Sequence, residues 1–283
     1  ETTWNKITVQ VDARDLETNL AETETYKYYL NDETTPKAVS NEPTYTFEAL
    51  TDGTNYKLRV EVYDKVGNKS EKIINTSTQV VITKIYTKED MEEFRDTVNE
   101  GCTYEGKIVE LMNNIDLQGN EENQWVPIGN SAINFSGIFE GNNYNIIDGY
   151  IKSQYSEIAM VTARNYGTLE NITTSGNIEG DTGVGGIAGG NESGRITKCV
   201  NYANIFATGS WAGGIMGYSH SSFVILECGN EGNVTSNEGY VAGIVGATNE
   251  DVSSCYNTGN IIGNGTGRGD DYGACSVGGI ARL

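Results

Sequence analysis

The sequence of 283 residues predicts an all-β protein in two parts, an antiparallel β-sandwich followed by a parallel β-helix. Its apolar residues fall into short bursts or strict alternation, which is typical of strands. Glycine is scarce up to about residue 82 and frequent afterwards, which indicates a domain boundary there. In the second part a phrase of roughly 28 residues recurs, and a period of that length indicates stacked supersecondary units.

Residues 1–82 are expected to form the β-sandwich. Apolar and polar residues alternate from Ile7 to Val11 and again from Tyr56 to Val62. Antiparallel strands with one buried face show this alternation. The sequence Asp-Lys-Val-Gly-Asn at 64–68 predicts a hairpin turn after the second of these strands.

A tyrosine corner is the most specific signal in this first part. Leu50, Thr54 and Tyr56 have its spacing, in which the phenol hydroxyl bonds a nearby backbone group. On these residues the segment resembles a fibronectin type III domain, an Ig-like sandwich. We expect a structural role for Tyr56.

Residues 88–98 are predicted to form a helix. Met91, Phe94 and Val98 share one face, and Thr87 with Asp90 approximates a capping box. A β-helix has open ends with unpaired strand edges, which natural proteins cover. We therefore expect this helix to cap the N-terminal end of a β-helix formed by residues 83–283.

A Gly-Gly-Ile or Ala-Gly-Ile core defines the repeat. Its isoleucines Ile187, Ile215 and Ile244 lie 28 and 29 residues apart, and the phrase begins again around Ile280. Each repeat offers three short strands, enough for one coil of a β-helix. Equivalent residues of successive coils then lie about 4.8 Å apart, so the isoleucines are expected to form an inward ladder.

Three further positions recur with the same period. Ile172, Cys199, Cys228 and Cys255 are expected to form a second inward ladder, in which cysteine acts as a small apolar residue. The glycines beside the isoleucines fit corners that need positive φ or close approach of the backbone. Asparagine recurs at Asn177, Asn204, Asn233 and Asn260, where we expect left-handed turns. The five cysteines predict neither a disulfide framework nor a metal site, and the pairing of Cys102 and Cys275 stays open.

The whole phrase, G-G-I-x-G followed by C-x-N-x-G-N-I, resembles the GLUG repeat of Gram-positive surface proteins. The segment before it, which includes Trp-Val-Pro-Ile-Gly at 125–129 and Phe-Ser-Gly-Ile-Phe at 135–139, resembles the entry coils of such proteins. The resemblance covers roughly residues 85–283. It implies a right-handed β-helix on the cell surface, here of about six coils, and assigns no activity.

Charge and hydropathy restrict the partners. Nineteen basic and 39 acidic side chains give a formal charge of −20, which repels nucleic acid and anionic lipid. No apolar stretch reaches the roughly 18–20 residues of a membrane-spanning helix, and no signal peptide is visible at Glu1. The sequence stops partway into another repeat, so either residues 281–283 end the solenoid unusually or, as we expect, the chain is a fragment of a longer protein. We also expect a monomer that is secreted or attached to the cell wall.

Two aromatic residues are the first candidates for binding. Trp211 and Tyr240 stand four residues before repeat isoleucines, and alternation places both outward on adjacent coils. Neighbouring exposed aromatic rings form platforms for sugar rings or partner proteins. The alternative, packing under the 263–275 loop or against the other domain, stays open.

The longest insertion carries the second candidate. Ile244 and Ile280 lie 36 residues apart, so a projecting loop is expected between them. Arg268, Gly269 and Asp270 spell an R-G-D sequence that could engage an integrin. Asp270 and Asp271 could instead bind Ca²⁺, and an inert loop is the third reading.

No residue pattern predicts catalysis or a cofactor. His220 lies beside serines but lacks an identifiable third residue of a triad. The glycan-cleaving enzymes that share the β-helix fold need clustered aspartates or a carboxylate pair, and the repeats supply neither. The sequence thus predicts a non-catalytic module for adhesion or for binding a host or cell-wall glycan or an extracellular protein. The alternative is the accessory region of a larger secreted peptidase or glycan-degrading enzyme.

Overall fold

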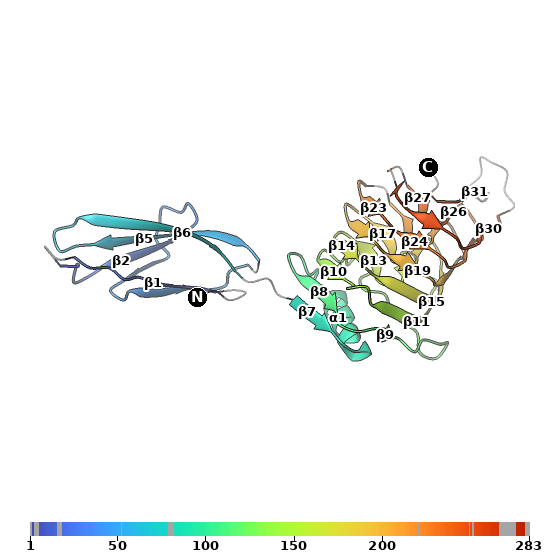
Figure 1. Cartoon of the computed structure of the whole chain (residues 1–283), viewed down its shortest axis with the longest axis horizontal. Coiled ribbons are helices and arrows are strands. Elements are labelled where there is room, and N and C mark those ends of the chain that lie inside the picture. The colour runs from blue at the N-terminus through green and yellow to red at the C-terminus, as the bar shows by residue number, and fades with distance from the viewer. Residues whose placement is uncertain are drawn as a thin grey trace. The chain divides into compact units, whose positions relative to one another are not determined.

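A computed structural model describes residues 2, 6–15, 19–51, 53–78, 82–219, 221–248, 250, 252–265 and 276–280. Strands account for 47% of the structure and helix for 5%, which confirms the all-β class. The chain divides into two compact units, Glu1–Val81 and Ile82–Leu283 (Figure 1).

The first unit contains two antiparallel sheets. One pairs β1 (Ile7–Gln10) with β4 (Thr44–Phe47). The other has the order β3-β2-β5-β6 and comprises β2 (Tyr26–Leu30), β3 (Ala38–Ser40), β5 (Asn55–Tyr63) and β6 (Lys69–Ser77). Both sheets contribute buried side chains to one apolar core, among them Ile7, Phe47, Tyr28 and Leu58.

Two local predictions for this unit are confirmed. The hydroxyl of Tyr56 accepts a hydrogen bond from the backbone N–H of Thr51 at 2.8 Å, as a tyrosine corner requires. The β5–β6 hairpin turns where expected, and Asp64 accepts backbone hydrogen bonds from Val66 and Asn68 at 3.0 and 2.7 Å. These contacts fix the backbone before and after β5.

Glu61 is the centre of a polar cluster on β5. Its carboxylate accepts hydrogen bonds from the hydroxyls of Tyr29 and Tyr63, both at 2.9 Å. Lys69 and Arg59 pair with the same carboxylate at 2.9 and 3.1 Å. Burial raises the pKa of Glu61, but the hydrogen bonds from Lys69 and the tyrosines outweigh it and lower that pKa to about 2.

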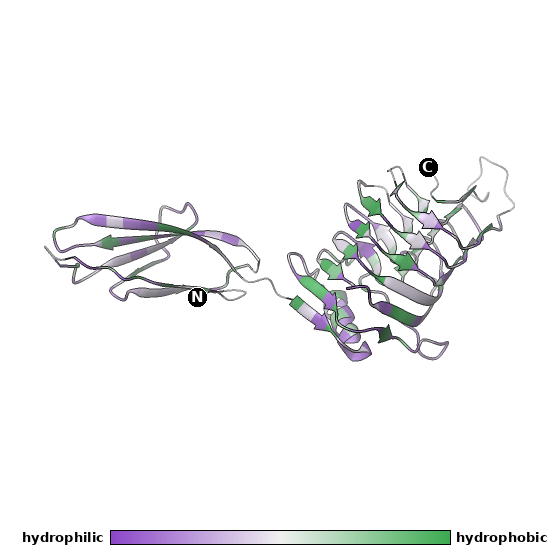
Figure 2. Cartoon of the chain, in the orientation of Figure 1, coloured by the Kyte–Doolittle hydropathy of each residue, from purple (hydrophilic) through white to green (hydrophobic). Residues whose placement is uncertain are grey.

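The second unit is a parallel β-solenoid of about seven turns. The expected number was about six, and the strands β7 and β8 of the entry segment lie in the same sheet as those of the repeats. Figure 1 shows the turns stacked in sequence order from β7 onwards, and Figure 2 shows hydrophobic segments recurring in successive turns. Within the described residues the strands form four parallel sheets, here called sheets 1 to 4.

Sheets 1 and 2 are the longer ones. Sheet 1 contains β7 (Ile82–Ile85), β8 (Ile108–Leu111), β10 (Ile138–Glu140), β14 (Thr168–Glu170), β18 (Arg195–Thr197), β23 (Val224–Leu226) and β28 (Val252–Ser253). Sheet 2 contains β9 (Ile115–Asp116), β11 (Asn145–Lys152), β15 (Thr173–Gly180), β19 (Val200–Asn201), β20 (Asn204–Ala207), β24 (Gly229–Asn230), β25 (Val234–Ser236), β29 (Tyr256–Asn257) and β30 (Ile261–Gly263).

Sheets 3 and 4 consist of short strands on either side of the repeat isoleucines. Sheet 3 contains β12 (Ile158–Ala159), β16 (Val184–Gly185), β21 (Ala212–Gly213), β26 (Tyr240–Ala242) and β31 (Ser276–Gly278). Sheet 4 contains β13 (Thr162–Asn165), β17 (Ala188–Asn191), β22 (Met216–Tyr218) and β27 (Val245–Ala247).

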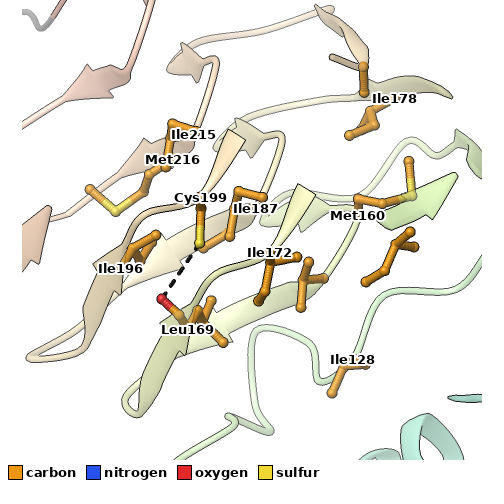
Figure 3. Close-up of a cluster of buried hydrophobic side chains, with 14 of the residues drawn as sticks. Ile128, Met160, Leu169, Ile172, Ile178, Ile187, Ile196, Cys199, Ile215 and Met216 are labelled. Atoms are coloured by element: carbon orange, nitrogen blue, oxygen red, sulfur yellow. Dashed lines mark hydrogen bonds between the residues drawn. The ribbon is translucent and has the colours of Figure 1, made fainter. Parts of the chain in front are cut away.

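The predicted isoleucine ladder is confirmed. The N–H of Ile187 donates to the carbonyl of Ile215 at 2.9 Å, and Ile215 donates to Ile244 at 3.0 Å. All three side chains are fully buried, and Ile244 donates to Ile280 at 2.8 Å in the next turn. Figure 3 shows Ile187 and Ile215 inside the stack of turns.

The cysteine ladder is confirmed as well. Ile172, Cys199 and Cys228 are fully buried, and Cys255 packs against the same core. The thiol of Cys199 donates to the carbonyl of Thr197 at 3.3 Å. It also donates to the carbonyl of Leu169 at 3.6 Å (Figure 3). The hydrogen bond with Cys199 raises the pKa of the Cys228 thiol to about 12, so this thiol is neutral at pH 7.

The prediction for the repeated asparagines is wrong. Asn177, Asn204, Asn233 and Asn260 do not have positive φ. The left-handed position of the repeat is the residue just before the cysteine ladder, with φ between 53° and 57° at Asn171, Lys198, Glu227 and Ser254. The corner glycines serve close approach, since a Cβ on Gly214 would lie 2.1 Å from the carbonyl oxygen of Gly243.

The predicted capping helix is α1 (Lys88–Asn99). Thr87 and Asp90 form the capping box, and Met91, Phe94 and Val98 are buried. The Phe94 ring lies 4.9 Å from the ring of Tyr104 and 5.8 Å from that of Phe139 in β10. The helix therefore covers the core of the first turns, as expected.

Candidate functional site

The predicted aromatic residues lie at equivalent positions of adjacent turns. Ala212 in β21 pairs with Val241 in β26, which aligns the preceding residues Trp211 and Tyr240. Tyr240 is 41% exposed, whereas Trp211 is half-buried. The Trp211 ring packs against Tyr218, with ring centroids 4.9 Å apart. Although Trp211 lies on the outside of the turn, the Tyr218 ring therefore covers part of it, at the corner between sheets 3 and 4.

Tyr218 occupies this outer corner between sheets 3 and 4. It is 8% exposed and leans back over the preceding turn, where a Cβ on Gly183 would lie 2.9 Å from its ring. Its hydroxyl donates to the carboxylate of Glu157, one further turn back. Burial, with the hydrogen bond to Glu157, raises the pKa of Tyr218 to about 12.

Glu157 is also held by Arg164. The guanidinium contacts both carboxylate oxygens, with Nε 3.1 Å from Oε2. The hydrogen bond with Glu157 raises the pKa of Arg164, so this guanidinium stays charged. A bidentate arginine and a phenol satisfy the Glu157 carboxylate. This cluster stabilises the corner, and its charged groups are paired with one another.

A shallow trough runs along the outward face of sheet 2 across five turns. It has a volume of about 600 Å³. One side is an asparagine ladder formed by Asn177, Asn204, Asn233 and Asn260, with Tyr150 at its start. The other side carries Glu179, Phe206, Thr235 and Ile262, two residues further along the same strands.

The amides of this outward ladder bond to one another. Each Nδ2 donates to the Oδ1 of the previous turn, at 3.3 Å for Asn204, 3.0 Å for Asn233 and 3.1 Å for Asn260. An amide has two N–H donors, so each of these side chains keeps a second donor. The ladder therefore presents neutral hydrogen-bonding groups at regular intervals of about 4.8 Å.

A second ladder of asparagines lies in the core. Asn201 donates to Asn230 at 2.8 Å, Asn230 donates to Asn257 at 2.7 Å, and Thr174 donates to Asn201 at 3.0 Å. Asn201 and Asn230 also donate to the carbonyls two residues ahead. In each Cys-x-Asn-x-x-Asn phrase the first asparagine thus holds the corner, and the second faces the trough.

The R-G-D residues Arg268, Gly269 and Asp270, the Ca²⁺ candidate Asp271, and also His220 and Cys275 lie outside the described residues. Within the described ranges, no group of three or more His, Cys, Asp or Glu side chains is arranged to hold a metal ion. Cys102 is a free thiol. Among the described segments, no helix has the length and hydropathy to cross a membrane.

Comparison with known proteins returned no matching family model, no matching curated protein and no matching solved structure. The resemblances to GLUG repeats and fibronectin type III domains remain predictions that depend on the residues quoted for them.

Proposed function

We propose that this chain is a non-catalytic binding module of a secreted or cell-wall-attached protein, and that the trough on sheet 2 holds a neutral, elongated glycan. The observation that supports it is the continuity of the trough over five turns. Four spacings of about 4.8 Å give about 19 Å of surface, enough for several sugar units in a row.

The lining of the trough suits a polyhydroxylated chain without charge. The amide ladder offers a repeated donor to hydroxyl groups, while Phe206 and Ile262 offer apolar surface to C–H groups. The formal charge of −20 disfavours anionic polymers. A neutral glycan carries no charge, and it presents both the hydroxyl groups and the C–H groups that this lining can contact.

The proposal includes the finer architecture. The two antiparallel sheets, β1-β4 and β3-β2-β5-β6, and the Tyr56 corner support a fibronectin type III-like sandwich. A right-handed coil is supported by the strong preference for right-handed connections between parallel strands. Together with the GLUG-like phrase, these features favour a Gram-positive surface protein.

Calorimetric titration with neutral linear oligosaccharides, chosen from a glycan array, tests the proposal. Phe206→Ala should weaken binding about tenfold or more, because a central aromatic contact is typically worth over 1 kcal/mol. Asn233→Ala should also weaken binding by interrupting the amide ladder. Tyr166→Ala, which removes a 42% exposed tyrosine outside the trough, is the matched control. Equal affinity of all variants for every glycan bound would sink the proposal.

The same titration tests the aromatic platform predicted at Trp211 and Tyr240. If these rings contact the ligand, Tyr240→Ala and Trp211→Ala should each weaken binding. Because the Trp211 ring also packs on Tyr218, Tyr240→Ala is the cleaner variant. Unchanged binding in both would exclude the platform and leave the trough as the site.

A further inference from the structure

A second concave site lies at the first turns of the solenoid. It is bounded by the 124–131 and 151–158 segments and has a volume of about 620 Å³, in the usual range of small-molecule sites. We call it the first-turn pocket. It shares only Ile151 with the residues that line the trough, so each site can be tested with its own variants.

The floor of the first-turn pocket is apolar and fixed. Trp125, Pro127, Ile158 and Ala163 line it and are buried. The indole N–H of Trp125 donates to the carbonyl of Met160 at 2.9 Å, and the guanidinium of Arg95 lies 4.8 Å from the centre of its ring. A floor held in this way needs little ordering when a ligand binds.

The rim combines exposed apolar groups with polar groups that lack partners. Tyr155 is 73% exposed and Val126 is 53% exposed. Among the described residues, the hydroxyls of Ser131, Ser156 and Tyr155 make no hydrogen bond. The carbonyl oxygen of the Asn130 side chain accepts two backbone hydrogen bonds, which leaves its amide hydrogens for a ligand.

The charged groups at the pocket are already paired. Glu157 is held by Arg164 and by the hydroxyl of Tyr218. Lys152 pairs with Glu179 at 3.1 Å. A charged ligand would have to break one of these pairs or enter without a counter-ion, which is unfavourable. A neutral ligand meets no such cost.

The pocket lies beside the outer corner that Glu157, Arg164 and Tyr218 occupy in the following turns. Ile128 pairs with Thr162, which pairs with Ala188, so the corner continues from the entry segment into the repeats. In the repeats, the ring of Tyr218 fills the corner above Gly183. The carboxylate of Glu157 lines the pocket and also bonds Tyr218, so their cluster forms the end wall.

We propose that the first-turn pocket binds a single pyranose ring of a neutral saccharide. Such a ring presents C–H groups on its faces and hydroxyls around its edge. The faces match Tyr155 and the floor at Trp125, while the edge hydroxyls match Ser131, Ser156 and Asn130. A wholly apolar ligand would leave these polar groups unpaired beside it.

Proton–nitrogen NMR of the tryptophan indoles tests this directly, because Trp125 is one of three tryptophans and its indole signal can be followed on its own. The probes are glucose, galactose, mannose and N-acetylglucosamine with their disaccharides. We expect a saturable shift of the Trp125 indole signal with a Kd on the order of 1 mM, as the size of one ring implies.

Two exposed positions separate binding from folding. Tyr155→Ala should weaken the saccharide about tenfold, and Ser156→Trp, which fills the mouth, should abolish the Trp125 shift. Tyr166→Ala should leave it unchanged. The proposal is overturned if neither pocket variant changes the Trp125 titration, if no neutral saccharide shifts this signal, or if a charged or wholly apolar probe binds there more tightly.

Discussion

The hydroxyl of Thr162 is the clearest local defect of the solenoid core. Thr162 is fully buried, and its Oγ1 has no hydrogen-bond partner among the residues that the structure describes. It pairs with Ile128 in one neighbouring turn and with Ala188 in the other, so the hydroxyl lies in an apolar row. Burying an unpaired hydroxyl costs about 1–3 kcal/mol in protein mutational data. Thr162→Val, which keeps the shape and removes the hydroxyl, should stabilise the solenoid by about that amount.

Thr174 provides a matched control with the opposite expectation. It is equally buried, but its hydroxyl donates to the side-chain oxygen of Asn201 at 3.0 Å. Thr174→Val removes this bond at the start of the buried asparagine ladder. We expect a loss of about 1 kcal/mol, the typical net value of one hydrogen bond.

Urea titration followed by the fluorescence of Trp125 and Trp211 measures both changes. The midpoint should rise for Thr162→Val and fall for Thr174→Val, with unchanged slopes. Unchanged slopes are required because arrays of repeats can lose cooperativity, and a midpoint then no longer reports one free energy. A lower midpoint for Thr162→Val, or the same direction in both variants, would refute the reasoning.

Two further outcomes follow from the described contacts. The pKa of Glu61 is lowered from 4.5 to about 2, so its contribution to stability is complete above pH 4.5 and is lost as the pH falls towards 2. Glu61→Gln should not show this loss of stability when the protein is unfolded by acid. An acid-unfolding midpoint identical to that of the unsubstituted protein would contradict this expectation. Gly214→Ala should cost over about 2 kcal/mol, because its Cβ would lie 2.1 Å from the Gly243 oxygen in the next turn. Gly190→Ala, where the nearest atom is 3.4 Å away, should stay within about 0.5 kcal/mol in the same denaturation assay.

Periodicity predicted the core because the stacked turns force identical positions into contact. Ile187 and Ile215 face the same surroundings one turn apart, so their spacing alone defined the inward ladder. The capping helix was predictable for a different reason, since Thr87 and Asp90 act within one turn of helix. The left-handed backbone conformation of Lys198 was not predictable, because no single residue type that favours positive φ recurs at this position of the repeat.

The binding surfaces were harder to predict because they join positions without a shared residue type. Tyr218 reaches Glu157 across two turns and 61 residues, and only the glycine at 183 hints at the space it needs. The outward position of Trp211 was deduced from alternation, yet alternation cannot tell an open face from a concave corner. The first-turn pocket comes from the entry segment, where no repeat guides the alignment.

The trough contains one uniform row and one variable row, and these differ in what they can recognise. Identical amides at every turn bind a polymer equally well after a shift of one turn, so they fix neither its register nor its direction. The opposite row changes from Glu179, which pairs with Lys152, through Phe206 and Thr235 to Ile262. Only this variable row distinguishes the two ends of a bound chain. The selectivity of the proposed glycan site must therefore depend on the variable row. The asparagines contribute affinity but do not distinguish one register or direction from another.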